Sequence, residues 1–200
     1  MADIGLRTVR EDDLAHLAAI QPPDHEHDPG AEVFAGQSRE EHRQRLVRQG
    51  LWRSLGDWSP SSWCLDFVVE HDAQIVGVQT LEAQDFTSLR TVDSGSWLIA
   101  ASRGHGIGVA MREAVLGLAF DHLGALAAVS SARSDNAASL GVSRRLGYRD
   151  NGVTLNASEN GLVELQHMRL TTQEWQAAGR GDEVEVCGLT PCLPWFGIGA

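Results

Sequence analysis

Three glycines in five positions, Gly104, Gly106 and Gly108, stand directly before a helical pattern. The first N–H groups of a helix lack partners and carry partial positive charge, and glycines let such a backbone close around an anion. The segment therefore predicts a phosphate site at the mouth of a helix. A tight turn that packs a helix closely against a sheet needs the same glycines. The spacing does not match the dinucleotide-binding pattern G-x-G-x-x-G, because the sixth position counted from Gly104 is Val109 and not glycine.

The composition excludes several kinds of phosphate chemistry. All 16 basic residues are arginines, because the chain contains no lysine. A Walker A loop, a protein kinase and a pyridoxal enzyme each need a lysine, so this chain cannot carry any of these sites. The formal net charge of −11 argues against nucleic acid as the main partner. That charge suits a cationic substrate, and it equally suits plain solubility.

The spacing that does fit is R-x-x-G-x-G, formed by Arg103, Gly106 and Gly108, and a second block, NAASLGVSRRLGY (136–148), follows the next predicted strand. In this order the two blocks resemble those of the GNAT acyltransferases. The serine at the fourth position of the second block and the HMRL that ends the last strand look most like the ribosomal-protein N-terminal acetyltransferase branch. The resemblance covers about Ile4 to Leu170. It implies the GNAT fold: an α/β (α+β) domain whose mixed, mostly antiparallel sheet is splayed at the cofactor site, with helices on both faces.

The resemblance also implies the contacts of the cosubstrate, acetyl-CoA, with no metal. The backbone of Leu98, Ile99 and Ala100 would pair with the pantetheine arm where two strands splay apart. Asn136 would bond to the pantetheine or the acetyl end, but it is also a good helix N-cap. The pyrophosphate would bind to backbone N–H groups of Arg103, Gly104, His105, Gly106, Ile107, Gly108 and Val109. The Arg103 side chain is alternatively only a surface charge.

Acyl transfer from a thioester to an amine needs a donor aimed at the oxyanion, and the departing thiolate can need a proton. Many members of the family use a tyrosine at the eighth position of the second block for that proton, where this chain has Ser143. We expect Ser139, at the fourth position, to reach the sulfur instead, unless it is a packing residue. The place of Tyr148, the sole tyrosine, in the Leu-Gly-Tyr ending indicates packing.

The amine must also lose a proton before it attacks. Asp93 stands where related sequences often carry a glutamate, and it can act as the base through water; a solvated aspartate at a strand end fits the sequence equally. Glu82 and Asp85 are weaker candidates, and an amine that arrives neutral needs no base. The candidate catalytic residues are therefore Ser139 and Asp93.

The elements that must position these residues follow from the hydrophobic pattern. Strands are predicted at Ile4–Arg10, at Leu65–Ala83 (two strands around His71–Ala73), at Val92–Ala100, at Ala125–Ala132, about Arg149–Asn156 and about Gly161–Leu170. Helices are predicted at Glu11–Ile20, at Ser38–Trp52, after the glycine turn and at Asp135–Tyr148, and a helical turn is predicted from about Thr171. The helix after the glycines carries an apolar stripe of Ile107, Met111, Ala114, Val115 and Leu118.

We expect one domain, residues 1–170, and a C-terminal arm, residues 171–200. The arm contains LPWFGI (193–198), which is too apolar to remain free in water, so it packs on its own domain or on the partner subunit of a homodimer. The resemblance implies that Trp52, Trp58 and Trp63 come from a region that borders the acceptor site. They line a pocket, pack in the core or form a subunit contact.

The remaining patterns bear on location and metal binding. Three cysteines and the absence of a signal-peptide pattern favour a reducing compartment, so we expect a cytoplasmic protein. The segment DHEHD (24–28) has metal-ligand residue types but no zinc spacing, and we expect a solvated loop there.

The sequence thus predicts an acetyl-CoA-dependent N-acetyltransferase that acts on a primary amine. A protein N-terminus is the first candidate acceptor, and a small amine such as an aminoglycoside or a polyamine is the second. A non-catalytic CoA-binding module and a plain interaction domain are the alternatives.

Overall fold

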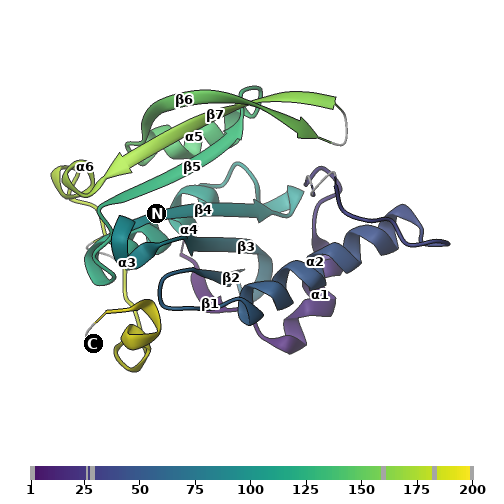
Figure 1. Ribbon diagram of the computed structural model, residues 1–200, viewed down its shortest axis with the longest axis horizontal. Coiled ribbons are helices and arrows are strands. Elements are labelled where there is room, and N and C mark those ends of the chain that lie inside the picture. The colour runs from purple at the N-terminus through teal and green to yellow at the C-terminus, as the bar shows by residue number, and fades with distance from the viewer. Residues whose placement is uncertain (1–2, 26, 28–29, 159–160, 182–183, 199–200) are drawn as a thin grey trace.

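The computed structural model describes residues 3–25, 27, 30–158, 161–181 and 184–198. Its seven strands form one sheet in the order β1-β2-β3-β4-β5-β7-β6 (Figure 1). The strands are β1 (Gly5–Thr8), β2 (Trp63–His71), β3 (Gln74–Ala83), β4 (Thr91–Leu98), β5 (Ala127–Arg133), β6 (Arg149–Ser158) and β7 (Gly161–Thr171). Neighbouring strands are antiparallel except β4 and β5, which are parallel. The mixed, mostly antiparallel sheet confirms the predicted fold class.

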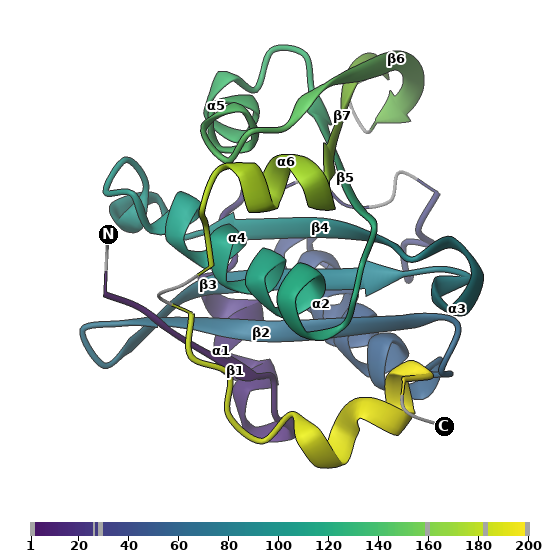
Figure 2. The same ribbon diagram turned by 90° about the vertical axis from the view of Figure 1, so that its left-hand side faces the viewer.

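Helices cover both faces of the sheet. They are α1 (Leu14–Ile20), α2 (Arg39–Gly56), α3 (Phe86–Leu89), α4 (Ile107–Gly117), α5 (Ala137–Arg145) and α6 (Thr172–Ala177). Figure 2 shows α4 in front of the sheet and α1 and α2 behind it. Alternation along β3 explains the two layers, because Val78 packs with α1 and α2 while Leu81 belongs to the core on the α4 side. The short α3 is the one α-helix among these that the sequence pattern did not predict.

Local signals in the sequence account for most helix ends. Ser38 caps α2, and its hydroxyl and the Glu41 carboxylate satisfy each other's backbone N–H groups in a capping box. The helix runs to Gly56, four residues beyond the predicted end at Trp52. The helix that the sequence predicts to stop at a glycine ends at Arg145, and Gly147 follows it with a φ of +97°, a conformation that favours glycine. Among the described residues, no helix is both long and apolar enough to cross a membrane.

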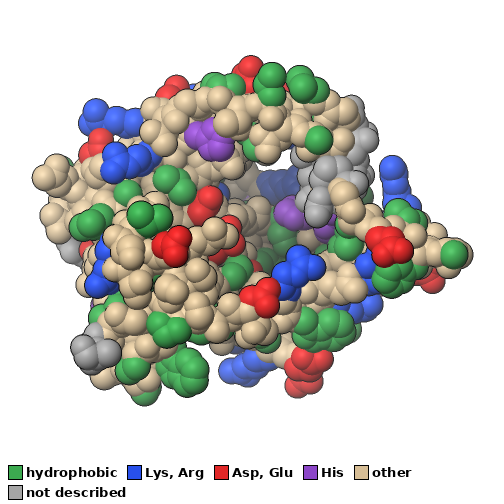
Figure 3. All heavy atoms as spheres, in the orientation of Figure 1, with side chains coloured by type: hydrophobic (Ala, Val, Ile, Leu, Met, Phe, Trp, Pro, Cys, Tyr) green, Lys and Arg blue, Asp and Glu red, His purple; other side chains and the backbone are tan. Residues whose placement is uncertain are grey.

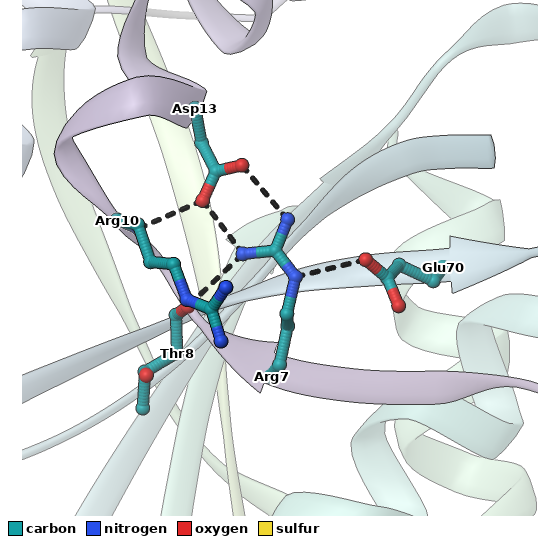
Figure 4. Close-up of polar contacts among 5 residues, drawn as sticks. All are labelled: Arg7, Thr8, Arg10, Asp13 and Glu70. Atoms are coloured by element: carbon teal, nitrogen blue, oxygen red, sulfur yellow. Dashed lines mark hydrogen bonds and ion pairs between the residues drawn. The ribbon is translucent and has the colours of Figure 1, made fainter. Parts of the chain in front are cut away.

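An ion-pair network holds β1 against its neighbours (Figure 4). The Arg7 guanidinium donates to both carboxylate oxygens of Asp13, at 2.7 and 2.8 Å, and to Glu70 on β2 at 2.9 Å. Asp13 also accepts the Arg10 N–H at 2.7 Å. The Arg7 hydrogen bond, foremost, lowers the pKa of Asp13. The network therefore ties the edge strand to the turn that leads into α1.

The C-terminal segment packs on the domain itself. In Figure 2 it passes below β1, drawn in yellow. Phe196 is 4 % exposed and meets the rings of Trp58 and Trp63 edge-on, with centroids 5.2 and 5.0 Å away. The indole N–H of Trp58 donates to the Trp195 carbonyl at 2.9 Å. Two of the three clustered tryptophans therefore contact the arm, whereas Trp52 is 48 % exposed.

Candidate active site

The site is organised by the point where β4 and β5 separate. These strands pair through only three positions, Thr91 with Ala127, Val92 with Ala128 and Asp93 with Val129. In Figure 1 they lie together at the left and separate toward the right. At the vertex the Ser130 hydroxyl donates to the Ser94 carbonyl at 3.4 Å, a weak side-chain link where the ladder has ended. Beyond it, no strand of the described residues pairs with this edge of β4.

On its other edge β4 stays tightly held by β3. A Cβ at Gly77 would collide with the Trp97 carbonyl, so only glycine permits this approach. The Ile99 N–H continues the contact by donating to the Val76 carbonyl at 2.9 Å. Because ladder hydrogen bonds alternate along a strand, the backbone groups of Ser94, Ser96 and Leu98 face the open edge.

The glycine turn lies between β4 and α4. Gly104 and Gly106 adopt φ of +81° and +83°, and Gly106 is the N-cap of α4. The N–H groups of residues 104 to 108 have no acceptor in the part of the chain that the structure describes. Arg103 and Val109 differ, because their N–H groups already donate to Ala100 and Gly106 at 3.2 and 3.1 Å. The turn therefore presents a run of five unpaired donors at a helix start, which is the geometry of an anion site.

The side chain of Arg103 is engaged elsewhere. Its guanidinium pairs with both oxygens of Asp24 at 2.6 and 2.9 Å, and its Nε donates to the Leu98 carbonyl at 3.0 Å. The neighbouring His25 ring lies 6.5 Å from the Trp97 ring. Asp24 and His25 of the DHEHD segment thus lie near the end of β4, whereas its Glu26 and Asp28 are outside the described residues.

The second block forms α5, across the opening from β4. The Asn136 side chain caps this helix, because its Oδ1 accepts the Ser139 N–H at 3.0 Å. The amide oxygen of Asn136 therefore has the N-cap role that the sequence allowed. Ser139 is half-buried, and its hydroxyl has no hydrogen-bond partner among the described residues. Tyr148 is 4 % exposed in the core.

Asp93 lies directly at the vertex, on the sheet face that α1 and α2 partly cover. It accepts the Ser94 N–H at 2.6 Å. Burial raises the pKa of Asp93, while the Ser94 N–H and the charges of Arg112 and His167 oppose that rise. Glu82 stands opposite Asp93 on β3, and burial followed by the Asp93 charge raises its pKa as well. Two neighbouring carboxyls with raised pKa values are suited to proton transfer near neutral pH.

The same face continues onto β2. Asp66 accepts the Thr80 hydroxyl at 2.6 Å, and Cys64 pairs with Glu82 across the ladder. Burial raises the pKa of the Cys64 thiol to about 12, so this cysteine is not a thiolate nucleophile. Figure 3 shows this face hollowed beside the sheet, with acidic side chains along the left of the hollow. Asp85 lies instead in a turn before α3, at φ +51°.

The sequence interpretation missed Arg112. It is 4 % exposed and lies on α4, where its guanidinium hydrogen-bonds to hydroxyls of Ser96, Ser130 and Ser143. The signal was available, because the segment from Ile107 to Phe120 is apolar around nearly its whole circumference. Such a helix is buried on all sides, so its charged residues must be buried with it.

Comparison with known proteins gives a family match. The model of the GNAT acetyltransferase domain matches residues 3–149. The fold is similar to that of Mycobacterium smegmatis RimJ, solved in complex with CoA-disulfide, with a TM-score of 0.67, 23% identity and 90% of each chain covered. It is also similar to the spermidine N-acetyltransferase of Vibrio cholerae, solved with CoA and spermine, with a TM-score of 0.64 and 14% identity over 86% of this chain and 98% of that chain.

Proposed function

From the premise that this chain belongs to the GNAT family and is an acetyl-CoA-dependent N-acetyltransferase, we propose where its substrates bind. Acetyl-CoA lies along the open edge of β4, and a primary amine approaches from the face that carries Asp93. The observation that carries this proposal is the run of five unpaired N–H groups at residues 104 to 108 beside a strand edge that leads to Asp93.

The pyrophosphate binds to the glycine turn. Its charge is met by the five N–H groups and by the positive end of α4. The pantetheine arm follows β4 toward the vertex. Of the three backbone positions that the resemblance implies, Ile99 uses both its N–H and its carbonyl within the chain, and Leu98 and Ala100 each use their carbonyl. The N–H groups of Leu98 and Ala100 and the open-edge groups of Ser96 therefore supply the contacts. Asn136, whose oxygen caps α5, has only its amide N–H₂ to offer the ligand.

The reaction is a direct attack. Asp93 accepts a proton from the ammonium form of the acceptor, and the freed lone pair forms a bond to the thioester carbon. The nitrogen loses its second proton to water as the tetrahedral intermediate collapses, and the electron pair of the C–S bond leaves on sulfur. Ser139, with its uncommitted hydroxyl on α5, donates a hydrogen bond to that sulfur. Glu82 is close enough in the ladder to share the proton of Asp93.

A protein N-terminus is the first acceptor, on the strength of the likeness to the ribosomal-protein acetyltransferase branch. A polyamine is the second, and a specific observation favours it: Asp66, Glu82 and Asp93 share one face of the sheet. Carboxylates on that face favour a polycationic acceptor. The sparse cysteines support a cytoplasmic location. In a homodimer, the C-terminal arm would contact the partner subunit instead of its own domain alone.

An acceptor panel tests the proposal by measuring thiol release from acetyl-CoA. The panel contains peptides with free N-termini, the same peptides with blocked N-termini, spermidine and an aminoglycoside. Release with free but not blocked peptides supports the first acceptor. Release with spermidine alone supports the second, and release with the aminoglycoside alone contradicts both. The Asp93→Asn protein serves as the matched control, because it keeps the volume of the side chain and removes the base.

A further inference from the structure

Arg112 is a charged side chain buried in the middle of the molecule. Its guanidinium donates from Nη1 to the hydroxyls of Ser130 and Ser143, at 3.1 and 3.0 Å, and from Nη2 to that of Ser96 at 3.4 Å. These three serines belong to β5, α5 and β4. The guanidinium therefore lies among the three elements that surround the vertex of the strand opening.

No anion of the described residues neutralises this cation. Within the part of the chain that the structure describes, Arg112 makes no ion pair and its Nε has no hydrogen-bond partner. Two further buried groups, the Tyr148 Oη and the Ser94 Oγ, lie close enough for Ser94 to oppose the rise of the Tyr148 pKa, but neither makes a hydrogen bond of 3.5 Å or less among the described residues. Tyr148 and Asp93 are the titratable groups that interact electrostatically with Arg112. Asp93 lies on the opposite face of β4.

This arrangement is costly for folding. A buried cation loses its hydration, and neutral hydroxyls replace that hydration only in part. Replacing buried charges by apolar side chains of similar volume is often neutral or stabilising, so stability alone does not explain Arg112. Unsatisfied polar groups that gather at one place indicate a site that is completed by something else.

We propose that Arg112 stabilises the thiolate of CoA as it leaves during acyl transfer. This inference rests on the proposed function, which leads the pantetheine arm along β4 to the vertex. It also accounts for Ser143, which stands where many members of the family carry a tyrosine acid and which here accepts a hydrogen bond from Arg112. The charge of Arg112 takes the place of a donated proton.

The step balances without a proton from the enzyme at the moment of bond cleavage. Asp93 has taken the first proton of the ammonium before the attack. The amine nitrogen then forms its bond to the carbonyl carbon and loses its second proton to water. The C–S bond breaks with its electron pair on sulfur, giving CoA thiolate beside the guanidinium. The thiolate takes its proton from water after it leaves. Arg112 stays charged throughout, because arginine does not deprotonate in proteins. It therefore transfers no proton and acts on the thiolate through its charge alone.

The direct test measures ionisation of the CoA thiol bound to the protein. The ultraviolet absorbance of the thiolate is followed against pH for CoA bound to the wild type and to the Arg112→Met, Arg112→Gln and Arg112→Lys proteins. We expect bound CoA to ionise about one pH unit lower in the wild type and in Arg112→Lys than in the two uncharged variants. Arg144→Met, which removes an exposed arginine of α5, is the matched control and should behave as the wild type.

Three results would overturn the inference. The first is the same ionisation midpoint in wild type and uncharged variants that bind CoA. The second is an unchanged kcat in those variants, since we expect it to fall about a hundredfold with the CoA affinity nearly unchanged and with partial recovery in Arg112→Lys. The third is failure of both uncharged variants to fold, which would make Arg112 a structural residue. Failure of the wild type to bind CoA would instead contradict the proposed function.

Discussion

Asp93 combines burial with a candidate role as a base, and the two properties predict opposite effects of one substitution. Its raised pKa means that it binds a proton more tightly in the folded chain than in the unfolded chain. That contribution to stability is present at low pH and is lost as pH rises through the raised pKa. At neutral pH the buried charge therefore opposes folding.

Asp93→Asn should accordingly lose about a hundredfold or more in kcat/KM at neutral pH while its melting temperature stays equal or rises. The lost rate should return as pH approaches the pKa of the amine, where the acceptor no longer needs a base. Activity is measured against pH beside thermal melts. A rate profile that runs parallel to that of the wild type eliminates Asp93 as the base and leaves an already neutral amine.

Asn136 presents a second question at the scale of one residue, because its oxygen already caps α5. Asn136→Ser keeps a capping oxygen but removes the amide donor, whereas Asn136→Ala removes both. If the amide binds CoA, the serine variant should melt as the wild type does and bind CoA about tenfold more weakly. The alanine variant should also lose about 1 kcal/mol of stability. Calorimetry that finds wild-type CoA affinity in Asn136→Ser would leave capping as the sole role.

At the scale of elements, the glycine turn joins the open edge of β4 to the start of α4. Gly106 has φ +83°, and no heavy atom lies within 4 Å of the Cβ that another residue would add there. A valine at this position would project into the space that an anion would occupy. Gly106→Val should weaken CoA binding about tenfold or more, because hydrogen bonds to charged groups are lost.

Backbone strain alone could produce the same effect, and Gly36 supplies the control. It has φ +81° and equally open surroundings, but it precedes α2 rather than α4. Gly36→Val should carry a similar strain and bind CoA as the wild type does. Equal loss of CoA affinity in both proteins, measured by calorimetry, would mean that the turn only shapes the fold.

For the molecule as a whole, the C-terminal arm closes a core that the sheet and helices leave incomplete. Val186, Leu189, Leu193 and Ile198 are partly buried against the main hydrophobic cluster, to which Phe196 belongs. Phe196→Ala should cost roughly 3 kcal/mol of unfolding free energy. Trp195→Ala, at a ring that is 64 % exposed, should cost little. Denaturant titration of both proteins compares them, and similar losses would contradict a specific role for Phe196.

The arm also bears on assembly. A chain that ends at Gly181 should melt at a lower temperature than the full chain because the Trp58 and Trp63 rings lose their partner. Light scattering of both chains tests the alternative in which the arm binds a partner subunit. A change of mass on truncation would support a homodimer held by the arm, and an unchanged mass would confine the arm to its own domain.

Much of the fold was predictable because its signals are local. Strand alternation, the capping box of Ser38 and Glu41, and the glycines before α4 each depend on residues a few positions apart. The order of elements and the two blocks therefore led to the right family and fold. The glycine turn before α4 followed too, since the N–H groups of residues 104 to 108 have no acceptor among the described residues, while phosphate binding there stays a prediction.

Only the tertiary structure decided what surrounds the chemistry. The pairing of Arg103 with Asp24 and the opposition of Asp93 and Glu82 join residues far apart in the chain. The burial of Arg112 among three serines depends on where β4 leaves β5 and on how α5 packs over the gap. No local pattern encodes that divergence. The solvation, charge neighbours and pKa of each candidate residue depend on these long-range contacts, so sequence could name the residues but not their environment.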